Sequence, residues 1–425
     1  MAAVIRNDLG SAQYYGAECL SKGANKGINH TRNIHEDEMS TTHINATKSL
    51  IQQMAEDPML VLDRMAFQNG AVDLGLGFPN FKPEKKITEA LSEAATGNDY
   101  MLHHYTRPYV ILLEPFYTPY KDMLMIRGAV PVFVPLHPCL DGDKQSSADW
   151  VIDKAQLENA VTQRTKAIFL NNPMNPLGKV FDREELLDIA NICIKHDLTC
   201  VADEVYQWLT YGGKHHMHIA KLPGMWQRTI TLGSAGKTFN VTGWKVGWCL
   251  GPKHLIQVLQ NYHFFCHSDQ PQYTTSKKTQ SINTEKSESE AVAVAFEKEM
   301  LILNTPDSYL HTFRKMAEEK RNKLCKYLNN AGFKAIVPEG CFYIIADITN
   351  AQGALMNKSE NTDEALDYKF AKWAVVEKKL CVMPFSIFFS KQHRHLSEKY
   401  VRLCFVKTDE TLKKAKDIFD QWNKN

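Results

Sequence analysis

The chain has 425 residues, of which 44% are hydrophobic and 23% charged, and its formal net charge is +2. This length is enough for roughly two to three domains. The dispersed and balanced charges exclude a basic nucleic-acid footprint, and no apolar run reaches the ~18 residues of a membrane-spanning helix, so we expect neither nucleic acid nor membrane as a partner.

Ten cysteines stand singly along the chain, mostly inside apolar runs. None forms a CxxC or Cys/His pattern, which predicts a reducing compartment and no bound metal. We do not expect the first residues to form a secretory signal, since their apolar run is too short. We therefore expect a cytoplasmic location. A mitochondrial one stays open, although Glu18 and Glu36 to Glu38 make the start more acidic than presequences usually are.

The first part of the chain shows three kinds of segment. Residues 1–45 are polar and predict a disordered extension. Residues 46–107 are expected to form the N-terminal segment of a small domain and a substrate loop, with helices at 46–69 and 86–97. Between these helices, Gly75 and Gly77 indicate a backbone that passes close to a ligand, or an ordinary turn.

An alternation of strands and helices begins at about residue 108 and continues to about 289. The predicted strands are 110–113, 130–135, 166–170 and 198–202, and the predicted helices are 122–127, 150–161, 183–196 and 254–265. Such alternation is typical of an α/β domain with a mostly parallel sheet flanked by helices. The almost wholly polar stretch 274–290 predicts an exposed loop.

Three polar clusters follow strands of this sheet, where ligands bind in such folds. They are Asn175, then Asp203 with Tyr206, and then Ser234 with Lys237. The last cluster lies in TITLGSAGKTFNVTGWKVGWCLG (229–251), in which two β-runs flank a tight turn and Lys245 follows Lys237 by eight residues. The alternative for this stretch is a strand–turn–strand with two solvated lysines.

The remaining residues, 290–425, predict a small α/β C-terminal domain. Helices are expected at 291–303, 310–329, 365–379 and 410–422, and strands at 333–337, 342–347 and 400–406. Alternation on the last strand places Arg402 on the face opposite its apolar neighbours. A guanidinium there suits bidentate binding of an α-carboxylate, and the alternative is a surface salt bridge.

The clusters together suit a Schiff-base cofactor. Lys237 supplies the amine that can bind an aldehyde. Asp203 would keep a pyridinium nitrogen protonated, and Tyr206 with Asn175 would donate to the ring oxygen. Ser234 and Lys245 would bind the phosphate. The plainer alternatives are a helix N-cap for Asp203, core packing for Tyr206 and an Asn-Pro turn for Asn175.

Several long motifs resemble the fold-type I aminotransferases, and within them the kynurenine aminotransferase group. They are SAGKTF (234–239), TGWKVGW (242–248), NPLGKVF (175–181), DEVYQW (203–208), LPGMW (222–226), PFSIF (384–388) and VRLCFVK (401–407). The resemblance extends from about residue 70 to the end of the chain.

The resemblance implies a pyridoxal 5'-phosphate enzyme with a large and a small domain, which acts as a homodimer with its site at the subunit interface. Lys237 would bind the cofactor covalently, and Arg402 the substrate carboxylate. Gly77 and Asn175 would also contact the substrate. Tyr105 would reach the partner subunit's phosphate, and Tyr117 would stack on the cofactor ring. The implied substrates are kynurenine, glutamine, and aromatic and sulfur amino acids with 2-oxoacids, with a possible cysteine-S-conjugate β-lyase side activity.

Two departures from the family pattern bear on catalysis. After Arg107 a block on the order of fifty residues is absent. In the family this block includes a turn that gives backbone N–H groups to the phosphate. A polar insertion occupies Thr274–Glu288, where the family has a short loop. The alternative to an active transaminase is therefore an impaired isoform or incomplete gene product that lacks part of the phosphate-binding region.

Overall fold

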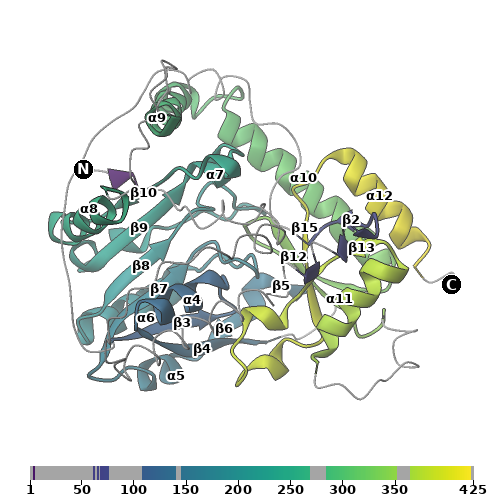
Figure 1. Ribbon diagram of the computed structural model, residues 1–425, viewed down its shortest axis with the longest axis horizontal. Helices are drawn as coiled ribbons and strands as arrows, with labels where there is room; N and C mark the ends of the chain where they lie inside the picture. Colours follow the sequence, from purple (N-terminus) through teal and green to yellow (C-terminus); the bar gives the residue numbers. More distant parts are fainter. Residues whose placement is uncertain are drawn as a thin grey trace, which may run out of the picture.

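The computed structural model describes residues 3–4, 61–62, 65–66, 68–75, 108–139, 145–268, 284–351 and 364–422. Within these ranges the chain forms two main sheets with helices packed on them (Figure 1). None of the helices there combines the length and the apolar character that crossing a bilayer requires.

The larger sheet has eight strands in the order β1-β10-β9-β8-β7-β3-β4-β6. Strands β9, β8, β7, β3 and β4 run parallel, whereas β10, β6 and β1 join antiparallel. The strands are β1 (Ala3–Val4), β3 (Tyr109–Glu114), β4 (Val130–Pro138), β6 (Trp150–Ile152), β7 (Thr165–Asn171), β8 (Thr199–Asp203), β9 (Thr229–Ser234) and β10 (Gly247–Leu250). The predicted α/β fold is confirmed.

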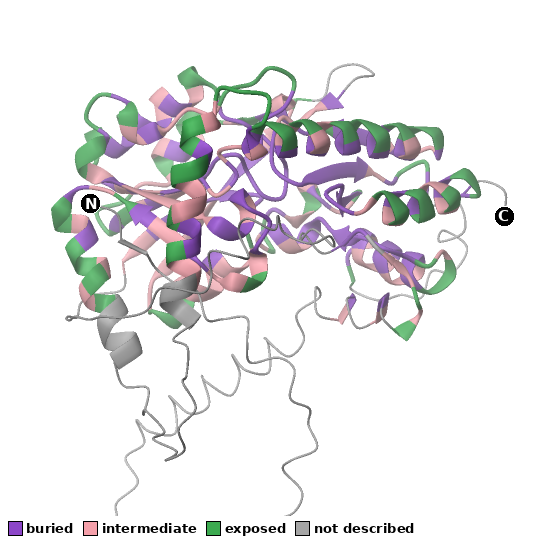
Figure 2. Cartoon of the chain, turned by 90° about the horizontal axis from the view of Figure 1, so that it is seen from above, coloured by how far each residue is buried: buried purple, intermediate pink, exposed green. Residues whose placement is uncertain are grey.

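Helices cover both faces of this sheet because its strands are apolar on both sides. Leu112 packs with Phe116 and Tyr120 beside α4, whereas Ile111 and Ile168 share the opposite core cluster with α6. The helices and 3-10 turns of this part are α4 (Pro119–Ile126), α5 (Lys154–Asn159), α6 (Arg183–Lys195), α7 (Ala235–Thr238), α8 (Lys253–Ser268), η3 (Ile219–Lys221), η4 (Trp226–Arg228) and η5 (Thr242–Trp244). The sheet is buried and the outer helix faces are exposed (Figure 2).

The second sheet has five strands in the order β14-β15-β12-β11-β5. Its strands are β5 (Gln145–Ser146), β11 (Lys334–Val337), β12 (Tyr343–Asp347), β14 (Met383–Pro384) and β15 (Tyr400–Cys404). Nearby are α10 (Tyr309–Asn330), α11 (Leu366–Glu377), α12 (Asp409–Asp420), η6 (Ser386–Phe388) and η7 (Arg394–Leu396), whereas α9 (Thr284–Ile302) packs against α7 and β10. A short pair, β2 (Val72–Asp73) with β13 (Leu380–Cys381), brings Gly75 toward this sheet.

A segment between β4 and β6 ties the two sheets together. Strand β5 pairs with β11 of the smaller sheet, and the turn η2 (Ser147–Asp149) leads at once into β6 of the larger one. The Ser147 hydroxyl donates to the Gly178 carbonyl at 3.1 Å and accepts the Glu339 N–H at 3.0 Å. Gly178 has φ +76°, and a Cβ there would lie 2.3 Å from Pro338 Cβ, so this contact requires glycine.

Four expectations from the sequence need correction. The helix predicted over 150–161 begins only at Lys154, because Trp150–Ile152 pair with β4 and Asp153 caps the helix by accepting two N–H groups. The loop predicted over 274–290 ends at Thr284, where α9 begins. The tight turn at Lys237 is one turn of helix. Within the extension predicted to be disordered, Ala3–Val4 form β1.

Other expectations lie outside the described residues. They are the rest of the extension, the helix over 86–97, and the polar stretch before Thr284. The predicted domain ranges stay predictions.

A buried carboxyl in the smaller part gives a testable pH effect on stability. Asp367 accepts the Ser386 N–H at 2.6 Å and its hydroxyl at 2.9 Å, and burial raises the pKa of Asp367 from 3.8 to about 7. Between pH ~4 and about 7 the folded chain therefore holds a proton on Asp367 that the unfolded chain has released. Protonated Asp367 thus stabilises the fold fully below pH ~4, and this stabilisation is lost as the pH rises through about 7.

Asp367→Asn removes this titration, while its amide oxygen can accept the Ser386 N–H and its NH2 can donate to the Ser386 hydroxyl. We expect the wild type to lose up to about 4 kcal/mol of unfolding free energy relative to the variant between about pH 4 and pH 8, with little further change above. Urea unfolding of both proteins across pH measures the difference. A difference that does not change with pH would contradict the assignment.

Candidate active site

The candidate site lies where β7, β8 and β9 end and the smaller sheet approaches. Parallel pairing aligns the ends of these strands, so Asn175, Asp203 and the Ser234–Lys237 turn come from adjacent connections. Strand β15 brings Arg402 from the other side, where it donates to Asn175. The convergence of the three clusters predicted from the sequence is therefore present in the fold.

Lys237 lies on the single turn of α7 with its amine in an aromatic setting. Its Nζ lies 5.7 Å from the Tyr206 ring centroid and 5.6 Å from that of Phe342. Burial lowers the pKa of Lys237, and the nearby charges of Arg402 and Lys245 lower it as well. The amine is thus biased toward its neutral, nucleophilic form.

A glycine is required directly before this lysine. A Cβ at Gly236 would lie 2.9 Å from the Thr242 Cα, closer than such atoms approach. The Thr242 hydroxyl also donates to the Gly236 carbonyl at 3.1 Å. The small residue therefore lets η5, whose C-cap is Lys245, pack against the turn that carries Lys237.

Asp203 is buried at the end of β8 and firmly oriented. One carboxylate oxygen accepts the Tyr120 hydroxyl and the other accepts the Val205 N–H at 3.2 Å. Its backbone carbonyl accepts from the Asn171 side chain and the Asn172 N–H, each at 2.9 Å. Burial raises the pKa of Asp203, which the Tyr120 hydrogen bond opposes. A cationic partner would therefore be strongly favoured beside it.

Tyr206 packs edge-on against Phe342, with ring centroids 5.1 Å apart. Burial raises the pKa of Tyr206 well above that of an ordinary tyrosine. Its hydroxyl therefore keeps its proton and can act as a donor. Core packing and a donor role are compatible here, because the ring is buried beneath the Lys237 amine.

Arg402 is a buried cation held from two sides. Its guanidinium carbon lies 4.1 Å from the Tyr343 ring centroid and 4.6 Å from that of Phe388. Its terminal nitrogens donate to Asn175 Oδ1 at 3.1 Å and the Gly75 carbonyl at 3.0 Å. Only 1% of Arg402 is exposed, so the alternative of a surface salt bridge is wrong.

Arg402 keeps unused binding capacity. Among the described residues no carboxylate lies within ion-pair distance of it, and its Nε is buried without a hydrogen-bond partner. Two of its five N–H donors are used by neutral oxygens. A buried charge without a counter-ion is costly, so this arrangement favours binding of an external carboxylate.

Three further predicted residues, Ser234, Lys245 and Tyr117, lie in the described part of the chain. Ser234 ends β9, and Lys245 is half-buried with a left-handed backbone, φ 57°. Tyr117 follows β3, is 38% exposed and packs edge-on against Tyr120 at 5.4 Å. Their contacts with phosphate and cofactor ring stay predictions. Gly77 and Tyr105 lie outside the described residues.

Three aromatic residues were missed in the sequence. Tyr120 stands three positions after Tyr117 in the first turn of α4, so the helical spacing could have indicated it. Tyr343 and Phe388 come from separate elements of the smaller part, and no local pattern links them to Arg402.

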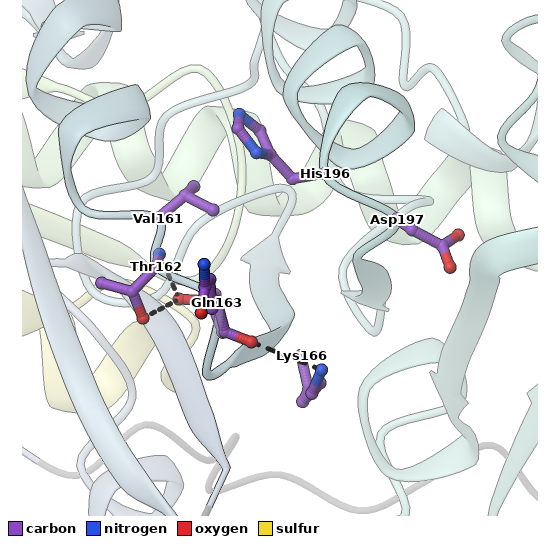
Figure 3. A pocket seen from close by; sticks show the side chains of 7 residues that line it. Val161, Thr162, Gln163, Lys166, His196 and Asp197 are labelled. Carbon is purple, nitrogen blue, oxygen red and sulfur yellow. Dashed lines mark hydrogen bonds between the residues drawn. The ribbon is translucent and has the colours of Figure 1, made fainter.

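A separate hollow of about 480 Å³ lies at the opposite edge of the sheet, where β7 begins and the chain enters β8 (Figure 3). Val161, Thr162, Gln163, Thr165, Lys166, His196 and Asp197 line it. The Lys166 amine approaches the Gln163 carbonyl there at 3.5 Å. The hollow lies where β7 and β8 begin, whereas Lys237 lies beyond the ends of these strands, so the hollow is not part of the candidate active site.

Comparison with known proteins gives a consistent picture. The model of the family "Aminotransferase class I and II" matches residues 92–419. The chain is 39% identical to kynurenine–oxoglutarate transaminase 3 of Mus musculus, covering 85% of this chain and 86% of that protein. It is 36% identical to kynurenine–oxoglutarate transaminase 1 of Homo sapiens, covering 86% and 96% respectively.

Solved structures show the same fold. A putative kynurenine aminotransferase from Saccharomyces cerevisiae has a TM-score of 0.76 at 24% identity, covering 88% of this chain and 98% of that one. An aspartate aminotransferase mutant from Thermus thermophilus has a TM-score of 0.67 at 21% identity, with the same coverage of 88% and 98%.

Proposed function

Because the chain belongs to the class I and II aminotransferase family, we propose that it transfers the amino group of kynurenine to 2-oxoglutarate with bound pyridoxal 5'-phosphate. Transfer of an amino group between an amino acid and a 2-oxoacid is the activity of the family. The choice of kynurenine and 2-oxoglutarate is supported by the names of the relatives, which are 34–44% identical to this chain.

One observation carries the proposal. A buried amine with a lowered pKa, Lys237, lies close enough to a buried carboxylate, Asp203, and a buried guanidinium, Arg402, to interact with both charges, and among the described residues Arg402 has no carboxylate at ion-pair distance. The donor set fits pyridoxal phosphate, because it offers an amine for the aldehyde, a carboxylate for the ring nitrogen and a hydroxyl, Tyr206, for the ring oxygen. When bound, the cofactor supplies the aldehyde and an electron-withdrawing ring.

The chain's own residues then have separate tasks. Arg402 binds the α-carboxylate of the amino acid through its remaining donors, and Tyr343 and Phe388 hold the guanidinium plane in place. The Lys237 Nζ, whose pKa is lowered by burial, would accept the proton from the substrate Cα and donate it back during amino transfer. Asp203, oriented by the Tyr120 hydroxyl, would supply a negative charge to the ring nitrogen of the cofactor.

The alternative of an impaired product is not favoured. Strand β3 pairs directly with both β4 and β7, so the larger sheet is continuous beyond the point where the block after Arg107 is absent. The residues for amine, carboxylate and guanidinium chemistry converge in the same fold.

A substrate panel tests the proposal. The purified protein, loaded with pyridoxal phosphate, is given kynurenine, glutamine, phenylalanine or methionine with 2-oxoglutarate, and glutamate is measured. We expect kynurenine to have the highest kcat/KM. Another preferred donor would correct the substrate, whereas no glutamate from any donor in a folded, cofactor-loaded sample would refute the proposal. A cysteine S-conjugate in the same panel tests the β-lyase side activity through the release of pyruvate.

The lowered pKa of Lys237 predicts a pH dependence that needs no substrate. Because only the neutral amine attacks an aldehyde, the rate of cofactor uptake by cofactor-free protein should rise with pH and level off clearly below 10.5, the ordinary lysine value. Stopped-flow absorbance measures this rate, with free lysine as the comparison. A profile that follows free lysine would contradict the burial of the amine.

Assembly and location complete the proposal. We expect a homodimer, on the strength of the role that the family resemblance gives to Tyr105, and sedimentation equilibrium tests it. We expect a cytoplasmic location, supported by the free thiols of the eight cysteines in the described ranges, since such thiols suit a reducing compartment. Imaging of the tagged full chain tests the location.

A further inference from the structure

A second cluster of ligand-type side chains lies just beyond the candidate active site. Glu204 follows Asp203 at the end of β8, and His216 and His218 lie in the segment that leads to η3. Glu204 Oε2 lies 3.0 Å from His216 Nε2 and also forms a hydrogen bond with His218 Nδ1. One ligand atom from each residue lies within 4.8 Å of the others.

The geometry around His216 differs from that of an ordinary hydrogen-bonded histidine. Both ring nitrogens are buried, and neither makes an aligned hydrogen bond within the described part of the chain, despite the 3.0 Å approach to Glu204. Two ligands of one tetrahedral zinc ion lie about 3.3 Å apart and point at the ion, not at each other. A close nitrogen whose ring is not aligned with the oxygen matches that second arrangement.

The two imidazoles are also placed as neighbouring ligands. Their ring centroids are 4.7 Å apart and their planes are nearly perpendicular, at 86°. Glu204 is anchored by its backbone, which donates to the Leu232 carbonyl at 3.0 Å. Rings packed edge to face in this way can each direct one nitrogen toward a common point.

We propose that Glu204, His216 and His218 bind a divalent transition-metal ion of the zinc class. Two imidazoles and one carboxylate form a donor set that zinc accepts, and three protein ligands leave a fourth position. The His218 side chain is 31% exposed, so the fourth position opens to solvent and takes water. The absence of a cysteine motif, which led to the expectation of no metal, has no bearing on a site built from these residues.

The ion has a structural consequence. It joins the segment before η3 to the residue next to Asp203, and so restrains the end of β8. Asp203 directs its carboxylate to Tyr120 and Glu204 directs its own to the histidines, so the ion and the amine of Lys237 belong to separate sites.

Metal binding is tested on the cofactor-loaded full chain after removal of metals by a chelator. Equilibrium dialysis against Zn²⁺, with metal measured by atomic emission, compares wild type, His218→Ala and His215→Ala. His218 is partly exposed, so its loss leaves the core intact, and His215 is an exposed neighbour outside the cluster. We expect wild type and His215→Ala to bind one more equivalent than His218→Ala.

The affinity of that equivalent should fall more than about 100-fold in His218→Ala, since even loss of an outer-shell partner costs 10–100-fold. Glu204→Gln, which keeps the shape, should give the same loss. Substitution with Co²⁺ should give a visible spectrum typical of a four-coordinate site in wild type but not in His218→Ala. Equal zinc binding by wild type and His218→Ala, or equal losses in His215→Ala and His218→Ala, would overturn the proposal.

Discussion

Lys237→Ala is expected to lower the turnover of the best amino donor with 2-oxoglutarate by at least about 10⁴-fold. The variant loses the amine that binds the aldehyde and the group that moves the proton at the substrate Cα. The Lys237 amine lies 5.7 and 5.6 Å from the ring centroids of Tyr206 and Phe342, so its loss leaves an apolar surface at this position. Steady-state glutamate production measures the loss, and the absorbance of lysine-bound cofactor should disappear with it.

Lys245→Ala is the matched comparison, because it removes a nearby amine and leaves Lys237 in place. We expect weaker cofactor affinity, by about 10- to 100-fold for one charged phosphate contact, with turnover restored at high pyridoxal phosphate. The melting temperature of each variant shows whether it is folded. A folded Lys237→Ala protein that keeps most of its turnover would show that the amine has been assigned to the wrong residue.

Arg402→Lys is expected to lower kcat/KM for amino acids by about 100-fold, within the 2–5 kcal/mol that truncation of a buried charge partner costs. Lysine keeps the charge but loses the planar fork, and it cannot lie flat between Tyr343 and Phe388. The effect should fall mainly on KM, since the chemistry at Lys237 is unchanged.

An amine without a carboxylate provides the control for Arg402. Phenylalanine and phenethylamine differ only in that group, so the wild type should prefer phenylalanine strongly and Arg402→Lys should lose most of this preference. If the variant lost activity equally toward both compounds, Arg402 would be acting on the fold and not on the carboxylate.

The strands and the polar clusters at their ends could be predicted because both depend on local sequence. Asp203 and Lys237 follow apolar runs, and the parallel order of such runs places their ends on one edge. Short or atypical elements could not be predicted in this way. Trp150–Ile152 are too few residues to show alternation, and their pairing with β4 overrides the helical pattern that follows. The start of α9 at Thr284 is polar and carries no apolar period.

Long-range contacts account for the rest. The alternation around Arg402 predicts the face of β15 on which it lies but not its burial. That burial depends on Tyr343, Phe388 and Gly75, which come from three other parts of the chain. The bond between Tyr120 and Asp203 joins residues 83 positions apart. No pattern in a single stretch of sequence carries such information.

The connection through η2 limits how the two sheets can move. Ser146 and Asp149 close it as a capping box, and the Ser147 hydroxyl binds Gly178 on one side and Glu339 on the other. A wide swing of the smaller sheet would break these bonds and the β5–β11 pairing together. The η2 connection therefore restrains relative movement of the two sheets to displacements that leave these hydrogen bonds and the β5–β11 pairing in place.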